Sequence, residues 1–142
     1  MSALVLDASV ALAFMFPGER QHECAREIIR DVKGSGAWIP DLWITEVGNS
    51  LLVAERRHRI EPSQADRLLV AIDLLRSMIV EPVHGVRLGH LHSLGRVHGL
   101  TAYDAAYLEL AQRKWAYPLA TFDVALRKAA VSEGLKLLPE TL

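Results

Sequence analysis

The chain is poor in the features that mark membrane proteins, secreted proteins and disulfide-bonded proteins. It contains no apolar run close to the ~20 residues that a membrane helix needs. The amino-terminal stretch is apolar, but it lacks a basic start and carries Asp7 inside the run, which is not how a secretory signal peptide is built. A single cysteine, Cys24, cannot form an internal disulfide. We therefore expect a cytoplasmic protein with no membrane partner.

The sequence also lacks a charge excess and the motifs of several enzyme classes. Its formal net charge is −1, so any contact with a nucleic acid has to be local rather than carried by a basic surface. There is no glycine-rich phosphate loop and no G-x-S-x-G nucleophile motif. The D-x-D pattern of an α/β phosphatase is missing, because Asp7-Ala8 is followed by Ser9. The chemistry has to be sought in individual side chains.

What is present is a globular composition in which strand-like and helix-like segments alternate. Of the 142 residues, 51% are hydrophobic and 23% are charged, which suits one domain, spanning residues 1–142, with a single core. Short apolar runs predict strands at 3–6, 38–39, within 78–83, at 118–121 and at 136–138. Helical spacing predicts helices between them, over 19–33, 41–58, 86–98, 101–115 and 124–133, after residue 9 and from residue 62. Because parallel strands joined through helices need crossovers, we expect an α/β fold: a small parallel sheet of about four or five short strands flanked by helices.

Several side chains have predicted places in these helices. Ser9 is expected to cap the short first helix, and Thr101 the helix that starts with T-A-Y-D. The helix over 41–58 has an apolar stripe at Trp43, Val47, Leu51 and Ala54. The helix from residue 62 is predicted to face inward at Leu68, Leu69, Ile72, Leu75 and Met78.

Four acidic residues stand where the apolar pattern predicts something else: Asp7 in ALVLDAS, Glu46 in LWITEVGNSLL, Asp104 in GLTAYDAAYLEL and Asp123 in PLATFDVAL. Asp7 and Asp123 directly follow strand-like runs, and the other two lie in the opening turns of helices. Ligand crevices of open parallel sheets lie beyond the carboxyl ends of the strands, so all four can point into one crevice. Because several carboxylates repel one another, such a crevice needs a cation, and hard oxygen ligands suit Mg²⁺ or Mn²⁺.

Each acid also has an interpretation that needs no ligand. Acids in first helical turns are favoured by the helix dipole and by free N–H groups, so each can be a simple cap. Capping explains Asp123 best, Asp104 less well because Thr101 already caps, and Asp7 poorly because Ser9 is the better cap. Glu46 alone is typical of a solvated helix face. The coincidence of four acids favours the metal site.

Four segments occur in an order that is familiar from one family. LVLDASV, ITEVGNSL, GLTAYDAAYLELA and PLATFD together resemble the PIN-domain ribonucleases, and most of all the VapC-like toxins of type II toxin–antitoxin modules. The resemblance covers essentially the whole chain and implies a Mg²⁺-dependent endoribonuclease, for which Mn²⁺ would substitute. Asp7, Glu46, Asp104 and Asp123 match the catalytic acidic set of the family, and Ser9, Asn49, Thr101 and Thr121 match its supporting polar positions. We expect Asp7 and Asp104 to contact the metal directly, and the other two acids to act through waters or a second ion.

The resemblance also implies partners. An RNA would be the substrate, and a cognate antitoxin would lay a peptide over the acidic crevice, with a basic residue at the metal position. The apolar positions around 51–53 and 68–75 exceed what one small sheet needs, so a homodimer is expected. The alternative is a non-catalytic PIN-like module for binding or assembly, whose acids only cap helices.

Overall fold

The computed structural model describes residues 3–142, except the side chains of Met78 and Ile79. In this part of the chain there are five strands and seven helices, which confirms the predicted α/β class. The strands are β1 (Leu4–Leu6), β2 (Ala37–Pro40), β3 (Val80–Val83), β4 (Leu119–Ala120) and β5 (Leu137–Leu138). The helices are α1 (Ala8–Met15), α2 (His22–Val32), α3 (Leu42–Arg56), α4 (Pro62–Ile79), α5 (Leu88–His98), α6 (Ala102–Arg113) and α7 (Val124–Ser132).

The strands form one parallel sheet in the order β3-β2-β1-β4-β5. After β1 the chain adds β2 and β3 on one side, and it then crosses to the other side of β1 to add β4 and β5. The order of the strands therefore reverses between β1 and β4, which is where open α/β sheets bind their ligands. Leu6 is in register with Ala120, and the Asp7 N–H donates to the Ala120 carbonyl over 3.0 Å. The residues that follow these two strands consequently leave the sheet side by side.

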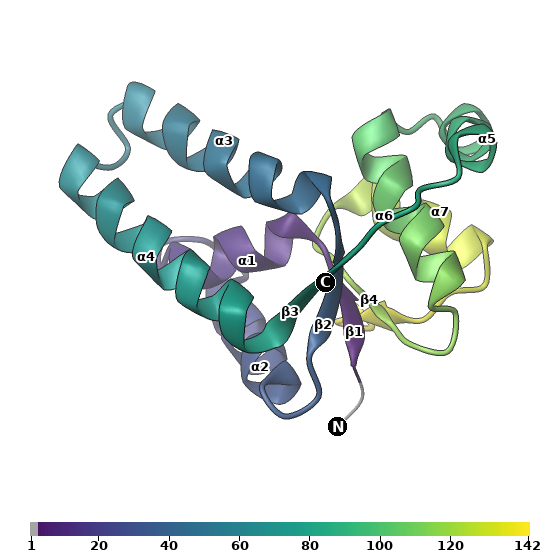
Figure 1. Cartoon of the computed structure of the whole chain (residues 1–142), viewed down its shortest axis with the longest axis horizontal. Coiled ribbons are helices and arrows are strands. Elements are labelled where there is room, and N and C mark those ends of the chain that lie inside the picture. The colour runs from purple at the N-terminus through teal and green to yellow at the C-terminus, as the bar shows by residue number, and fades with distance from the viewer. Residues whose placement is uncertain (1–2) are drawn as a thin grey trace.

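Figure 1 shows the sheet between two groups of helices, with α1 to α4 on one side and α5 to α7 on the other. Helices α3 and α4 pack on each other as a long pair that extends away from the sheet (Figure 1). Helix α6 lies against β1, β2 and β4 and is itself covered by α5 and α7. The helices that carry Glu46 and Asp104 thus reach the same edge of the sheet from opposite faces.

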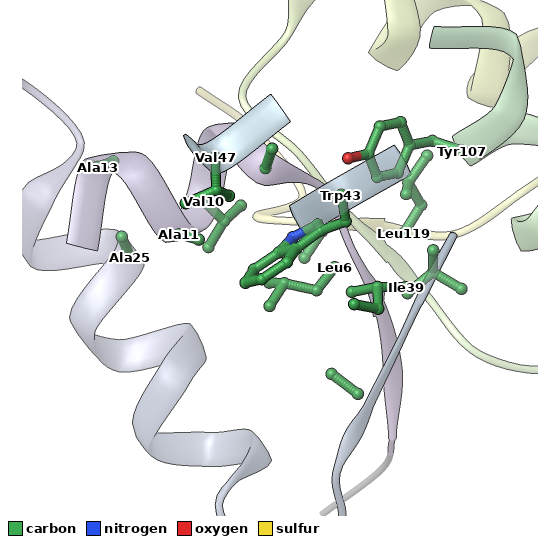
Figure 2. Close-up of a cluster of buried hydrophobic side chains, with 14 of the residues drawn as sticks. Leu6, Val10, Ala11, Ala13, Ala25, Ile39, Trp43, Val47, Tyr107 and Leu119 are labelled. Carbon is green, nitrogen blue, oxygen red and sulfur yellow. The ribbon is translucent and has the colours of Figure 1, made fainter. Parts of the chain in front are cut away.

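The core contains Trp43, which is fully buried on the first turn of α3. Figure 2 shows its indole ring in a cluster with Leu6 and Ile39 of the sheet and with Val10 and Val47 of the flanking helices. Replacing such a side chain by alanine costs about 3–5 kcal/mol, so the packing of Trp43 is a strong constraint on α3. The predicted stripe of Trp43, Val47, Leu51 and Ala54 is buried and thereby confirmed.

Some sequence-based expectations are wrong. Ser9 does not cap α1, because the N-cap position is Asp7 and Ser9 lies inside the helix. Leu69 does not face inward, because it is 46% exposed, whereas Ile72 and Leu75 are buried as predicted, together with Ala65. The strand predicted within residues 78–83 is confirmed as β3, which starts at Val80 because α4 continues to Ile79. The predicted inward orientation of Met78 lies outside the described side chains.

No helix within residues 3–142 combines the length and the apolar character needed to cross a bilayer.

Candidate active site

Asp7 is held by hydroxyl groups at the point where β1 and β4 end. It is only 6% exposed, and its Oδ2 accepts hydrogen bonds from Ser9 Oγ over 2.6 Å and from Thr121 Oγ1 over 2.7 Å. The same two hydroxyls accept from the backbone of the β4–α7 turn, Ser9 from the Phe122 N–H and Thr121 from the Asp123 N–H, each over 3.0 Å. This network fixes the orientation of the Asp7 carboxylate and ties the ends of the two strands together.

The carboxylate of Asp7 opens onto a pocket that contains all four predicted acids. The pocket has a volume of about 270 Å³ and is lined by Asp7, Ala8, Ser9, Leu12, Glu46, Asn49, Ser50, Asp104 and Asp123. Its walls come from the start of α1, from α3, from α6 and from the turn before α7. Acids separated by 19 to 58 residues along the chain are thus gathered at the switch in strand order. Of the supporting positions, Ser9 and Asn49 line this pocket, while Thr121 lies behind Asp7.

Two of the acids are involved in helix caps as well. Asp123 Oδ1 accepts from the Leu126 N–H over 2.7 Å, so Asp123 caps α7 as well as lining the pocket. Thr101 caps α6 as predicted, with its Oγ1 accepting from the Asp104 N–H over 3.2 Å. Thr101 is not part of the pocket wall, and its effect is to position Asp104. Asp7 occupies a cap position but makes no capping bond with its side chain, so capping does not explain it.

Tyr107 is a further residue of the site that the sequence analysis did not identify. Its hydroxyl donates to Glu46 Oε1 over 2.6 Å and joins α6 to α3 across the core. Burial raises the pKa of Tyr107, so the hydroxyl stays protonated and remains a donor. Its spacing could have linked Tyr107 to the site, because Tyr107 lies one turn after Asp104 and therefore on the same side of α6. An aromatic residue in an apolar stripe is, however, usually taken as core.

Burial and mutual repulsion act on the charges of these acids. Burial raises the pKa of Asp7 above its ordinary value, the Ser9 and Thr121 hydroxyls oppose this, and the charges of Asp104 and Asp123 add to it. The pKa of Glu46 is raised by burial, against the Tyr107 hydrogen bond, and further by Asp7 and Asp104. The pKa of Asp104 is likewise raised by burial and by Asp123, while the Thr101 hydroxyl lowers it. The pocket therefore brings several carboxylates together although burial and their mutual repulsion disfavour the charged form of each.

The donor set fits a hydrated divalent cation. Within residues 3–142, none of the four acids forms an ion pair with a basic side chain. In the same part of the chain no three acidic, histidine or cysteine side chains stand close enough together to enclose an ion by themselves. Magnesium does not require such a cage, because it keeps several waters and is usually held by one or two carboxylates. A pocket of 270 Å³ with carboxylates on several walls suits that mode of binding.

Comparison with known proteins identifies the family. The family model of the PIN domain matches residues 4–137. The chain belongs to the PIN-domain family. This confirms the family that the four sequence motifs indicated, and the acidic pocket lies on the part of the chain that the match covers.

Individual relatives of this PIN-domain chain agree with that assignment. Ribonuclease VapC3 of Pyrobaculum aerophilum is 31% identical over 111 residues, which cover 78% of this chain and 82% of that protein. The crystal structure of PAE2754 from Pyrobaculum aerophilum superposes with a TM-score of 0.68 at 25% identity, over 91% of this chain and 87% of the other. Mycobacterium tuberculosis VapC20, a toxin that cleaves the sarcin-ricin loop, shares the fold with a TM-score of 0.61 at 18% identity, over 91% and 95% of the two chains.

Proposed function

We propose that the protein is a metal-dependent endoribonuclease and the toxin of a toxin–antitoxin module, with residues 1–142 forming one nuclease domain. The observation that carries this proposal is the convergence of Asp7, Glu46, Asp104 and Asp123 on one pocket at the switch in strand order. Two similar proteins support this proposal. The Pyrobaculum aerophilum relative is named a ribonuclease, and Mycobacterium tuberculosis VapC20, which shares the fold, is a toxin that cleaves the sarcin-ricin loop.

In this proposal the residues of the pocket divide the work of phosphodiester hydrolysis. Asp7 and Asp104 hold Mg²⁺ directly, with Mn²⁺ as a substitute, and Glu46 and Asp123 complete the site through waters or a second ion. The bound cation supplies neutralisation of phosphate charge and a water that ionises near neutral pH. Ser9 and Thr121 keep the Asp7 carboxylate oriented, since both donate to its Oδ2.

The remaining groups position the acids and the substrate. Tyr107 holds Glu46 toward the pocket through its 2.6 Å hydrogen bond. Thr101 keeps the first turn of α6 intact and so places Asp104. Asn49 adds a neutral amide to the pocket wall, where it can donate to a phosphate without adding repulsion.

The partners we propose are an RNA substrate, an antitoxin and a second copy of the chain. A basic residue of an antitoxin peptide would satisfy the carboxylates as a cation does, because a guanidinium binds carboxylates through paired hydrogen bonds. The homodimer is supported by apolar side chains left exposed on the α3–α4 pair, namely Leu52, Leu69, Val70 and Leu74. Action on RNA and the single Cys24 fit the cytoplasm.

The test is cleavage of RNA by purified protein in EDTA, in Mg²⁺ and in Mn²⁺. We expect cleavage only with a divalent cation, and loss of cleavage in an Asp7→Asn protein purified in the same way. That variant controls for a contaminating ribonuclease, which would be equally active in both preparations. Undiminished cleavage in EDTA by the parent would contradict the metal dependence. No cleavage of any structured or single-stranded RNA with either metal would favour the non-catalytic assembly module instead.

A further inference from the structure

A second, mostly aliphatic cleft lies next to the acidic pocket. Its volume is about 300 Å³, and it is lined by Pro40, Asp41, Leu42, Val83, Val86, Leu91, Ala102, Tyr103, Ala106 and Arg113. The two sites share the helices α3 and α6. On α3, Leu42 of the cleft lies one turn before Glu46 of the pocket, and on α6 Tyr103 of the cleft is followed directly by Asp104. Pro40 and Val83 end β2 and β3, so the cleft continues the ligand-binding edge of the sheet.

One wall of this cleft is fixed by a buried cluster of charged groups. Glu109 is fully buried, and its Oε2 accepts from Arg113 Nη2 over 2.8 Å and Nε over 3.1 Å, while its Oε1 accepts from Arg87 Nε over 3.0 Å. Arg113 also donates from Nη1 to the His84 carbonyl over 2.8 Å. These bonds hold the connection between β3 and α5, and with it Val86, against α6. The cleft is therefore formed before any ligand arrives.

We propose that this cleft binds a nucleobase of the RNA substrate, adjacent to the phosphate that is cut, and that Tyr103 is its aromatic contact. The proposal rests on the nuclease function proposed above. Proteins recognise single-stranded RNA by splaying bases out of the strand and stacking them on aromatic side chains. Tyr103 offers such a ring, because it is 65% exposed at the edge of the cleft and next to a proposed metal-binding acid.

The charge around the cleft suits a polyanion better than the acidic pocket alone does. Arg87 and Arg113 carry two positive charges against the single carboxylate of Glu109, and the Arg87 side chain is 54% exposed. Counted with Asp41 of the cleft lining, the two arginines balance two carboxylates, so the cleft lacks the acidic excess of the neighbouring pocket. An RNA strand whose reactive phosphate lies among the carboxylates would place a neighbouring nucleotide within reach of the exposed Arg87 guanidinium.

The size of the cleft favours a base over a protein surface. A volume of about 300 Å³ lies at the lower end of small-molecule sites, which span ~300–1,000 Å³. A stable contact with a second copy of the chain buries above ~1,000 Å² and needs a much broader surface. The rim also carries a polar contact of 2.6 Å between Asp41 Oδ1 and His84 Nδ1, which a dry apolar interface would not favour.

The experiment compares Tyr103→Ala and Tyr103→Phe with Trp115→Ala as the matched control. Trp115 is a similarly exposed aromatic residue at 75%, but it lies beyond the other end of α6 and does not line the cleft. Cleavage of a randomised single-stranded RNA with Mn²⁺ gives KM, kcat and the base preference around the cut. Binding of the same RNA is measured in an Asp7→Asn background, so that this readout does not depend on catalysis.

For Tyr103→Ala we expect a rise of about tenfold in KM and in Kd, a flattened base preference at one position near the cut, and little change in kcat, because a lost base–aromatic contact weakens binding. Tyr103→Phe should restore all three, and Trp115→Ala should leave them unchanged. Unchanged Kd and base preference in Tyr103→Ala would overturn the cleft proposal and leave the nuclease intact. A parent that cuts no RNA, but whose RNA binding still weakens with Tyr103→Ala, would support the cleft and remove the nuclease proposal.

Discussion

Helix α6 carries two acids five residues apart with opposite surroundings: Glu109 pairs with arginines, and Asp104 lines a pocket of other acids. Glu109 is fully buried and is satisfied by the guanidinium groups of Arg87 and Arg113. Asp104 is partly buried in the wall of the acidic pocket, and no basic side chain within residues 3–142 pairs with it. Burying a charge is costly unless it is paired. The pairing of Glu109 with two arginines therefore explains its burial, whereas the surroundings of Asp104 provide no such compensation. This contrast supports the proposal that a cation completes the cluster to which Asp104 belongs.

The largest effect is expected from removing one charge of the unpaired cluster. Asp7→Asn should reduce RNA cleavage by at least about 10²–10³-fold, the range seen when one electrostatic partner of a transition state is lost. It should also raise the melting temperature of the metal-free protein and abolish most of the gain that Mn²⁺ gives the parent, because ligand stabilisation requires the ligand to bind. Thermal melts with EDTA and with Mn²⁺ measure this.

Asp66→Asn is the control, since this acid is exposed on α4 away from the pocket. It should keep both the activity and the metal-dependent shift. An equal metal-dependent shift in the parent, in Asp7→Asn and in Asp104→Asn would mean that neither carboxylate binds the ion.

The paired acid should show the reverse behaviour. Glu109→Gln should lower the free energy of unfolding by about 1–3 kcal/mol, because it removes the buried carboxylate charge with which two partly exposed guanidinium groups pair. Urea unfolding measures this loss. The variant should show no change in metal-dependent stabilisation as long as it is folded. A Glu109→Gln protein as stable as the parent would remove the contrast between the two acids of α6.

Glu46→Gln should have a smaller effect than Asp7→Asn, with a reduction of about 10–100-fold in cleavage, as is usual for groups that act on a metal through an intermediate shell. Glutamine keeps the size and the helix propensity, so the melting temperature should change little. Steady-state cleavage of RNA tests this, with Glu55→Gln on the same helix as the control. Turnover at the parental rate would restrict Glu46 to its structural hydrogen bond with Tyr107.

The stability of the metal-free protein and its activity with metal should depend on pH in opposite directions. The raised pKa values of Asp7, Glu46 and Asp104 mean that the folded state without metal holds protons more tightly than the unfolded chain. Their contribution to stability is therefore greatest below the ordinary carboxylate pKa and is lost as pH rises through the raised values. Activity runs the other way, because protonated carboxyls bind metal poorly, and should fall earlier on acidification than ordinary carboxylates would predict.

The measurement is the melting temperature of the parent and of Asp7→Asn in EDTA, in acidic and in neutral buffer. We expect the advantage of the variant to grow from acidic to neutral pH. An advantage that is the same in both buffers would show that the Asp7 charge is not the destabilising element.

The smallest effect on stability is expected at Asp123. Because asparagine caps a helix about as well as aspartate, Asp123→Asn should keep the bond from the Leu126 N–H and change stability by only a few tenths of a kcal/mol. Asp123→Ala, which removes the cap, should cost about 1 kcal/mol. Cleavage by Asp123→Asn then reports on the charge alone, and a fully active Asp123→Asn protein would restrict the role of this residue to capping.

Local pattern was sufficient for most of the elements but not for the details of their contacts. Hydrophobic periodicity located the strands, the helices and the buried stripe of α3, because these follow from side chains close together in the sequence. The pattern failed at Leu69, since which of two adjacent apolar residues is buried depends on how α4 meets α3. The pattern also failed at Ser9, whose hydroxyl donates to Asp7 and accepts from the Phe122 N–H instead of capping a helix.

By itself, the sequence determined the α/β class through its hydrophobic periodicity and the PIN-domain family through the resemblance of four motifs. It also indicated the four acids, because acids at strand ends and helix starts stand out against an apolar pattern. Only the tertiary structure decided that these acids share one pocket, because that requires β4 to pair with β1 across more than a hundred residues of chain. It also decided which partner each acid has: Tyr107 for Glu46, the hydroxyls of Ser9 and Thr121 for Asp7, and two arginines for Glu109. Such pairings join residues far apart in the chain, and packing rather than local propensity selects them.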